Sequence, residues 1–213
     1  MGIPSEARRE VDYPNPSPHP GAAAAEAWHS FLRGGWLVTR HTPGPAARTV
    51  VAWSIEGLPK GDLPSAEELR VAALRAQGNP VKTLAAETGR SISRTAESLK
   101  SAMRKLLITT ESELVGFFCA WPRAMWVSSA STGEGRQMLI RYMPPSWSLP
   151  MYLSCAEKGI VRALLAGHSQ AAIARASGVA TRTVSNQIAS VYRKVNVHSR
   201  MDLFVALTRA DWT

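Results

Sequence analysis

Residues 153–207 read LSCAEKGIVRALLAGHSQAAIARASGVATRTVSNQIASVYRKVNVHSRMDLFVAL, and this stretch decides the fold that we expect. Its apolar residues recur at helical spacing, and Gly167 and Gly178 interrupt them at points where helices commonly end. The pattern predicts three helices, over Ala156–Ala166, Gln170–Ala176 and Thr181–Val195. Two short helices followed, after a tight turn, by a longer helix form a helix-turn-helix.

The predicted third helix has one apolar and one polar face. The apolar residues, which recur at helical spacing and should face the core, are Val184, Ile188, Val191 and Val195. The other side carries Arg182, Ser185, Asn186, Ala189 and Arg193. An arginine can donate to guanine, an asparagine can pair with adenine, and small residues permit close approach to base edges. The helix alone leaves two interpretations open, a face that contacts DNA bases or a solvated face on a packed helix.

At these residues the sequence resembles the LuxR/FixJ-type (GerE-like) helix-turn-helix. The residues that match the family's pattern are Glu157, Leu164, Gly167, Ser169, Ile173, Ala174, Thr183, Val184, Lys194, Val195, Val197 and Arg200. The resemblance implies a four-helix DNA-binding domain of a bacterial transcription regulator. It also implies base-facing positions for Ser185, Asn186 and Ala189, and an internal ion pair between Glu157 and Arg200.

The stretch departs from the family's pattern at three positions. The family usually has a lysine where Ser185 stands, often a histidine at Gln187, and a capping serine at Ala180, which leaves Thr181 as the candidate cap. These departures affect the expected base preference and leave the fold unchanged. The expected DNA contacts, of which the last two should reach phosphates, are Ser169, Thr181, Arg182, Thr183, Ser185, Asn186, Ala189, Arg193 and Lys194.

A weaker copy of the pattern lies 89 residues upstream. The residues that recur unchanged at this offset include Gly78 as Gly167, Gly89 as Gly178, and Ser101 as Ser190. The offset continues toward the N-terminus, where each copy begins with a helix and a β-hairpin. The predicted helices are Ala22–Leu32 and Ser112–Trp121, and the predicted strands are Gly35–Thr42, Arg48–Ile55, Ala124–Ala130 and Arg136–Met143.

We therefore expect an α+β fold, mainly α, in which two tandem copies of helix, β-hairpin and LuxR-type helix-turn-helix form a pseudo-dimer. The hairpins either pair into one sheet, which we expect, or act as wings beside DNA. The predicted segments are a disordered Pro-rich tail over 1–20, helix and hairpin over 21–62 and 112–148, a degenerate helix-turn-helix over 63–111 and a LuxR-type one over 149–213.

The upstream copy offers a second candidate recognition helix over Ser93–Leu106. Its expected DNA contacts are Ser93, Arg94, Glu97, Lys100, Arg104 and Lys105. Glu97 would repel phosphate, although a glutamate can accept from cytosine. The sequence therefore leaves open whether this copy contacts DNA or is retained for packing. Glu111 stands where Arg200 stands in the other copy, so no ion pair of that kind is expected with Glu68.

The composition favours an anionic partner. The formal net charge is +9, and the pI is about 10.2, which indicates nucleic acid first and an acidic membrane second, with simple solubility as the alternative. Residues 153–213 carry eight Lys or Arg against three Asp or Glu, a net of +5, whereas residues 63–115 carry eight against six, a net of +2. The C-terminal copy should attract phosphates more strongly.

Other features argue against a membrane protein or an enzyme. Cys119 and Cys155 lie in apolar surroundings and are expected to be buried thiols in a reducing compartment. No apolar run approaches the roughly 18 residues that span a bilayer, and the charged N-terminus does not suggest a signal peptide, so we expect a cytoplasmic protein. The five histidines show no metal-ligand spacing, and no phosphate-binding or nucleophile motif is present.

The leading hypothesis is a sequence-specific, double-stranded-DNA-binding transcription regulator without a cofactor. It would act as a monomer with a pseudo-two-fold axis or as a homodimer, and the predicted last helix, Met201–Arg209, is a candidate for self-association. The alternative is a protein-interaction module, whose partner would be RNA polymerase or another regulator. An enzyme is the weakest of the three hypotheses.

Overall fold

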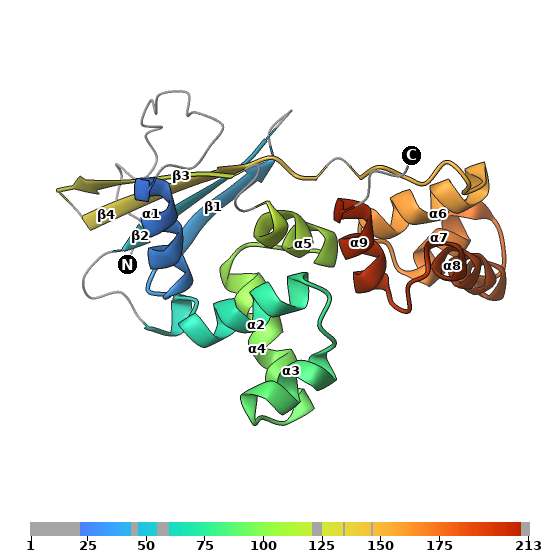
Figure 1. Cartoon of the computed structure of the whole chain (residues 1–213), viewed down its shortest axis with the longest axis horizontal. Coiled ribbons are helices and arrows are strands. Elements are labelled where there is room, and N and C mark those ends of the chain that lie inside the picture. Colours follow the sequence, from blue (N-terminus) through green and yellow to red (C-terminus); the bar gives the residue numbers. More distant parts are fainter. Residues whose placement is uncertain are drawn as a thin grey trace.

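The computed structural model describes residues 22–43, 47–54, 60–120, 125–133, 135–145 and 147–209. The chain is mixed α/β and mainly helical, with one four-stranded antiparallel sheet (Figure 1). The sheet lies at one end of the molecule, helices α6 to α9 lie at the other, and α2 to α5 lie between them (Figure 1). The Pro-rich tail predicted over residues 1–20 lies outside the described residues.

The two predicted hairpins pair into one sheet, which confirms the packing interpretation. The strands are β1 (Leu37–Pro43), β2 (Arg48–Ser54), β3 (Met125–Thr132) and β4 (Gly135–Tyr142), in the order β1-β2-β4-β3. Strands β2 and β4 join the hairpins through seven paired positions, with Val50 opposite Ile140. The predicted strand ends are correct to within two residues.

One face of the sheet is covered by aromatic side chains from two helices. Alternate strand residues, including Val50 and Ile140, are buried on this face. Helix α1 (Ala22–Leu32) lies against the sheet and contributes Trp28, whose ring centroid lies 5.5 Å from that of Phe117 on α5 (Glu111–Cys119). These contacts hold α5 next to the sheet.

Two sets of helices follow the same order at the offset of 89 residues. The first set is α2 (Ala66–Ala76), α3 (Val81–Thr88), α4 (Ile92–Lys105) and α5, preceded by a short 3-10 helix over Lys60–Asp62. The second set is α6 (Cys155–Leu165), α7 (Gln170–Ser177), α8 (Thr181–Val195) and α9 (Arg200–Arg209). The prediction for α8 is confirmed with the same bounds.

The helix ends use matching caps in the two sets. Ser65 and Ser154 form capping boxes with Glu68 and Glu157, at the starts of α2 and α6. Gly89 and Gly178 end α3 and α7 with the same left-handed geometry, φ 65° and ψ 25°, which a side chain would strain.

The start of α8 has no side-chain cap. Ala180 is its N-cap residue and makes no side-chain hydrogen bond, whereas Ser91 at the corresponding place accepts one from the Arg94 amide. The sequence-based suggestion that Thr181 caps α8 is wrong, because Thr181 is already the first helical residue. Ser169 caps α7 as predicted, since its hydroxyl accepts a hydrogen bond from the Ala172 amide.

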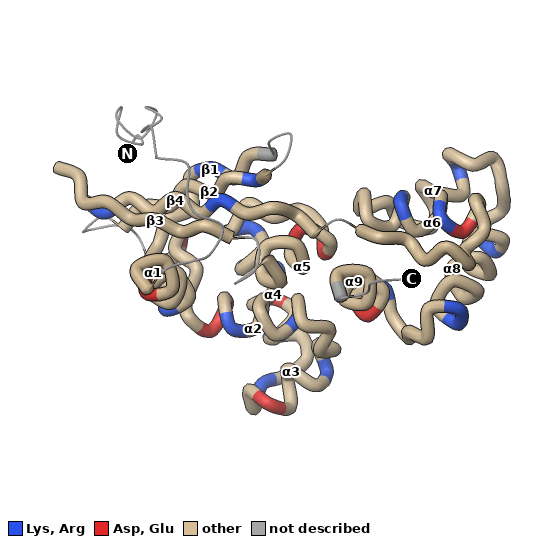
Figure 2. Tube along the Cα trace, turned by 45° about the horizontal axis from the view of Figure 1, so that its top comes forward, with Lys and Arg blue, Asp and Glu red and all other residues tan. Residues whose placement is uncertain are grey.

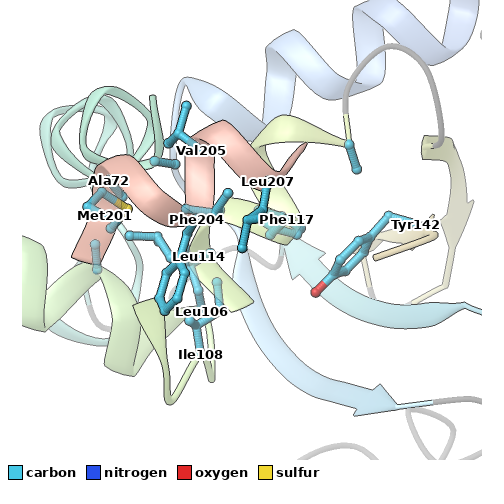
Figure 3. Packing of buried hydrophobic residues seen from close by; sticks show 14 of the residues in the cluster. Ala72, Leu106, Ile108, Leu114, Phe117, Tyr142, Met201, Phe204, Val205 and Leu207 are labelled. Carbon is cyan, nitrogen blue, oxygen red and sulfur yellow. The ribbon is translucent and has the colours of Figure 1, made fainter. Parts of the chain in front are cut away.

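Helices α5 and α9 pack together and join the two helical sets. Figure 3 shows Leu114 and Phe117 of α5 near Met201, Phe204 and Leu207 of α9, which are all buried. Residues from the end of α4 and the loop after it complete this part of the core. Because α5 is also packed on α2, one continuous core runs through the described helices.

The environments of the cysteines and tryptophans partly match the expectations. Cys119 is half-buried, and its thiol lies 3.5 Å from the Ala76 carbonyl oxygen. The expectation that Cys155 is buried is wrong, because this residue begins α6 and its side chain is exposed. Of the described tryptophans, those at positions 28, 36 and 53 are buried and those at 126 and 147 are half-buried. No helix within the described residues is long and apolar enough to cross a bilayer.

Candidate nucleic-acid interface

Helix α8 presents a row of exposed residues opposite its buried side. The buried residues are Val184, Ile188, Val191 and Val195, as the periodicity predicts. The exposed row of α8 consists of Arg182, Asn186, Ala189 and Arg193, which are all exposed. Successive members stand three or four residues apart and so follow one side of the helix. The row extends over nearly the whole length of α8.

The polar members of this row are free of intramolecular partners. Within the described part of the chain, the side chains of Arg182, Asn186 and Arg193 make no hydrogen bond or ion pair. A guanidinium presents donors in a planar fork, and a carboxamide presents a donor and an acceptor side by side. These are the groups that pair with guanine and adenine edges in the major groove.

Ser185 lies at the border of the exposed row and faces α7. Its hydroxyl oxygen lies 2.8 Å from Gln170 Oε1 and 3.0 Å from the Thr181 carbonyl oxygen, and the residue is half-buried. Two further predicted contacts, Thr181 and Thr183, are exposed on the first turn of α8, and Ser169 is exposed at the start of α7. The N-terminal ends of α7 and α8 therefore lie open to solvent beside the row.

Lys194 is held by an internal partner. Its ammonium nitrogen lies 2.8 Å from Glu157 Oε2, and Ser190 donates a hydrogen bond to the other carboxylate oxygen at 2.9 Å. Hydrogen bonds from Lys194 and the Ser154 amide lower the pKa of Glu157 to about 2. Of the two predicted phosphate contacts, Arg193 has no intramolecular partner, whereas Lys194 is paired with Glu157.

The ion pair implied between Glu157 and Arg200 is absent from the structure. Arg200 instead donates hydrogen bonds to the Leu164 and His168 carbonyl oxygens, at the C-terminal end of α6. Its guanidinium carbon also lies 5.3 Å from the ring centroid of Phe204. Arg200 thus ties the start of α9 to the end of α6 and the turn after it, where the Leu164 carbonyl oxygen also accepts a hydrogen bond from the Gly167 amide.

Helix α4 presents a matching exposed row 89 residues earlier. This row consists of Ser93, Glu97, Lys100 and Arg104, all exposed, and Arg94 is exposed beside it. No hydrogen bond or ion pair in the described structure engages the side chains of Glu97, Lys100 or Arg104. The two rows differ in charge pattern, since Glu97 stands at the place of Asn186 and Lys100 at the place of Ala189.

Lys105 does not belong to this exposed surface. Its side chain is 9% exposed, and its ammonium nitrogen lies 2.9 Å from Glu68 Oε2 and 2.9 Å from the Leu63 carbonyl oxygen. Its predicted role as a DNA contact needs revision for the same reason as that of Lys194. Glu111, at the place of Arg200, pairs instead with Arg75 at 2.9 Å.

The two Glu–Lys pairs occupy corresponding positions, and sequence reasoning missed them. Glu68 and Lys105 stand 89 residues before Glu157 and Lys194, and each pair joins the first helix of its set to the third. The signal that could have found them was the recurrence of opposite charges at the same offset.

The charge around α8 is almost entirely positive. Figure 2 marks Lys and Arg along α6, α7 and α8. The acidic residue of these three helices, Glu157, is buried against Lys194. A surface of this kind attracts phosphates without any need for base recognition.

Comparison with known families assigns the C-terminal set of helices. The family model of bacterial regulatory proteins, luxR family, matches residues 151–207. A search of curated proteins and a search of solved structures each gave no match. Helices α6 to α9 therefore form a luxR-type helix-turn-helix domain, which indicates a DNA-binding transcription regulator. No cluster of metal-binding side chains occurs among the described residues.

Proposed function

We propose that this protein is a sequence-specific regulator that binds double-stranded DNA and places α8 in the major groove. The observation that carries the proposal is the exposed row of α8, whose Arg182, Asn186 and Arg193 are left without intramolecular partners. Exposed side chains are commonly hydrated, so what distinguishes these three is their alignment along one side of a helix within a luxR-type domain. This alignment supports an external partner.

The members of the row take different roles in this proposal. Arg182 donates to guanine and Asn186 pairs with adenine, while the small side chain of Ala189 admits a base edge or a thymine methyl group. Arg193 reaches a phosphate at the far end of the helix. The exposed hydroxyl groups of Ser169, Thr181 and Thr183 lie at the N-terminal ends of α7 and α8, where helix dipoles favour phosphate.

Helix α4 is a second recognition helix in this proposal. Its row offers Ser93, Glu97, Lys100 and Arg104, with Arg94 beside it. Glu97 accepts from cytosine, and the cationic side chains near it balance its repulsion of phosphate. The two helices would therefore select different base sequences, and one chain would bind a site with two unlike halves.

We infer that the two halves arose by internal duplication. The matching caps, the matching Glu–Lys pairs and the central pairing of β2 with β4 support this inference. Helix α5 serves both halves, since it ends the first helical set and begins the second unit. One chain thus forms a pseudo-dimer. Its first half consists of segments 21–62 and 63–111, and its second half consists of segments 112–148 and 149–213. Light scattering would show whether the chain is a monomer or a homodimer in solution.

The proposal is tested with the full chain and a fluorescent duplex of the preferred sequence, selected from a random library, with an unrelated duplex for comparison. Substitution of Arg182, Asn186 and Arg193 by alanine together should weaken binding at least tenfold. Arg175→Ala is the matched control, because Arg175 is exposed on α7 and lies outside the row. Equal losses for the triple variant and this control would contradict the proposal, as would an affinity that no variant changes.

A further inference from the structure

A β-bulge in β1 directs the side chain of His41 toward the helices. The pairing of β1 with β2 is regular except at Thr39, an extra residue between Val38 and Arg40 that the register skips. An extra residue of this kind reverses the alternation of side chains along a strand. His41 therefore shares the covered face of the sheet with its strand partner, the buried Val50, instead of pointing to the opposite face.

The imidazole ring of His41 joins the sheet to the end of α4. Its Nδ1 lies 3.2 Å from the carbonyl oxygen of Leu106, the C-cap residue of α4, and its Nε2 lies 2.8 Å from the Tyr142 hydroxyl on β4. A carbonyl oxygen only accepts hydrogen bonds, so Nδ1 carries the proton of the neutral ring. Nε2 is then an acceptor, and the Tyr142 hydroxyl donates to it. We call these two contacts the His41 link.

Charged groups from two further elements face this link. Arg48 on β2 pairs with Glu113 on α5, with 2.6 Å between Nη1 and Oε1. The Arg48 guanidinium also faces the hydroxyl oxygen of Tyr142. The other carboxylate oxygen of Glu113 accepts hydrogen bonds from two backbone amides at the start of α5. A positive charge added to the ring would therefore lie near an arginine, while the nearby carboxylate is already engaged.

These surroundings favour the neutral form of His41. Burial, the largest cause, lowers the pKa of His41 below its ordinary value of 6.5. The Leu106 carbonyl and Glu113 oppose this change, and Arg48 adds to it. A second proton on the ring would also remove the acceptor of the Tyr142 hydroxyl, because both nitrogens of an imidazolium are donors. Protonation thus breaks the contact at Nε2 and brings two cations together.

The second half of the chain differs at the corresponding places. At the offset of 89 residues, Ala130 stands at the place of His41 and is exposed on β3, and Gln137 stands at the place of Arg48. The pairing of β3 with β4 runs without a bulge. Helix α8 also lies at the other end of the molecule from the sheet (Figure 1). Within the described residues, the His41 link therefore serves α4 and not α8.

We propose that the His41 link is a proton-sensitive switch, which holds the end of α4 on the sheet near neutral pH and releases it under mildly acidic conditions. The folded protein takes up the proton less readily than the unfolded chain does. The stabilisation is therefore complete above about pH 6.5 and is lost as the pH falls below that value. Helix α4 also carries an exposed row, so an effect of pH on DNA binding rests on the proposed function. The switch itself is tested without DNA, and the two can fail separately.

Urea unfolding of the full chain between about pH 7.5 and pH 5 tests the switch. Glu113 and Glu157, whose folded pKa is about 2, are affected only below their ordinary value of 4.5, so this range isolates the histidine. The unfolding midpoint of the natural chain should fall between pH 6.5 and 5. His41→Gln should remove most of this fall, because an amide can still donate to the carbonyl of α4 but does not titrate. His29→Gln is the matched control and should keep the fall, since His29 is exposed on α1.

Amide hydrogen exchange of the natural chain locates the effect and decides the matter if His41→Gln does not fold. After correction for intrinsic rates, the amides of Leu107 and Ile108 at the end of α4 should lose protection as the pH falls through the same range. The corresponding amides of Asn196 and Val197 at the end of α8 should keep theirs. A fall in midpoint that persists in full in His41→Gln or disappears in the control, or equal changes in protection at both helix ends, would overturn the proposal.

Discussion

The carboxylate of Glu157 on α6 lies 2.8 Å from the ammonium nitrogen of Lys194 on α8. The same carboxylate completes the capping box with Ser154, so one side chain both starts α6 and ties it to the last turn of α8. This contact orients the exposed row of α8 relative to the rest of the unit. Lys194 is therefore held by an ion pair, whereas the side chain of its neighbour Arg193 has no intramolecular partner.

The Glu157 pair makes the stability of the protein depend on pH. The folded pKa of Glu157 is about 2, below its ordinary value of 4.5, because Lys194 and the Ser154 amide stabilise the carboxylate. A lowered pKa means that this stabilisation is complete above pH 4.5 and is lost as the pH falls toward 2. In urea unfolding, Glu157→Gln should be less stable than the natural chain at pH 7, and the gap should shrink between pH 4.5 and 2. A gap that stays constant over this range would contradict the assignment.

Arg193 and Lys194 should differ in their effects on the salt dependence of DNA binding. Arg193→Gln removes a free cation, so the slope of log affinity against log salt should flatten by about one unit. Lys194→Met should leave that slope nearly unchanged and should lower the unfolding midpoint in urea, because it leaves the buried Glu157 carboxylate without its partner. Fluorescence anisotropy at several salt concentrations provides the slopes. Equal slope changes for both variants would show that Lys194 leaves Glu157 in the complex.

Arg182 and Asn186 should carry base discrimination. Arg182→Ala and Asn186→Ala should each weaken binding to the preferred duplex by about 1–3 kcal/mol and leave binding to unrelated duplexes nearly intact. Ser177→Ala is a suitable control, because Ser177 is exposed at the end of α7 away from the row. Losses of the same size on every duplex would show that these residues contact only the backbone.

Leu107 stores backbone strain that its counterpart avoids. Its φ is 55°, and that of Asn196, 89 residues later, is 58°, so each ends its long helix in the left-handed region. Asparagine tolerates this region, whereas a leucine side chain costs roughly 1–2 kcal/mol there. Since Leu107 is 46% exposed, Leu107→Asn loses little apolar burial. We expect a gain of about 1 kcal/mol in the free energy of unfolding in urea, and a loss of stability would contradict this account.

The sequence was most informative where one periodic signal dominates. Thr181–Val195 was predicted with correct bounds because its valines and isoleucine recur along one face and Gly178 ends the helix before it. The strand ends were less certain, since the partner strand sets where pairing stops, and the β2–β4 pairing joins residues about ninety positions apart.

Side-chain partners were the least predictable part. Lys194 follows Arg193 by one residue, which turns it about 100° around the helix and toward α6. Nothing in the local pattern distinguishes that direction from the exposed one. The resemblance supplied Arg200 as the partner of Glu157, but in this chain Arg200 reaches the carbonyl end of α6 instead. Cys155 was expected to be buried from its apolar neighbours, yet it stands at the first position of α6 and points outward.

The central claim is that the exposed row of α8 determines which DNA sequence is bound. Selection from a random duplex library by the full chain, repeated with Asn186→Ala, tests this claim directly. We predict an enriched motif with two unlike halves, in which the substitution relaxes the base preference of one half and leaves the other unchanged. The absence of any enriched motif, or the same motif with the same preferences for both proteins, would contradict it.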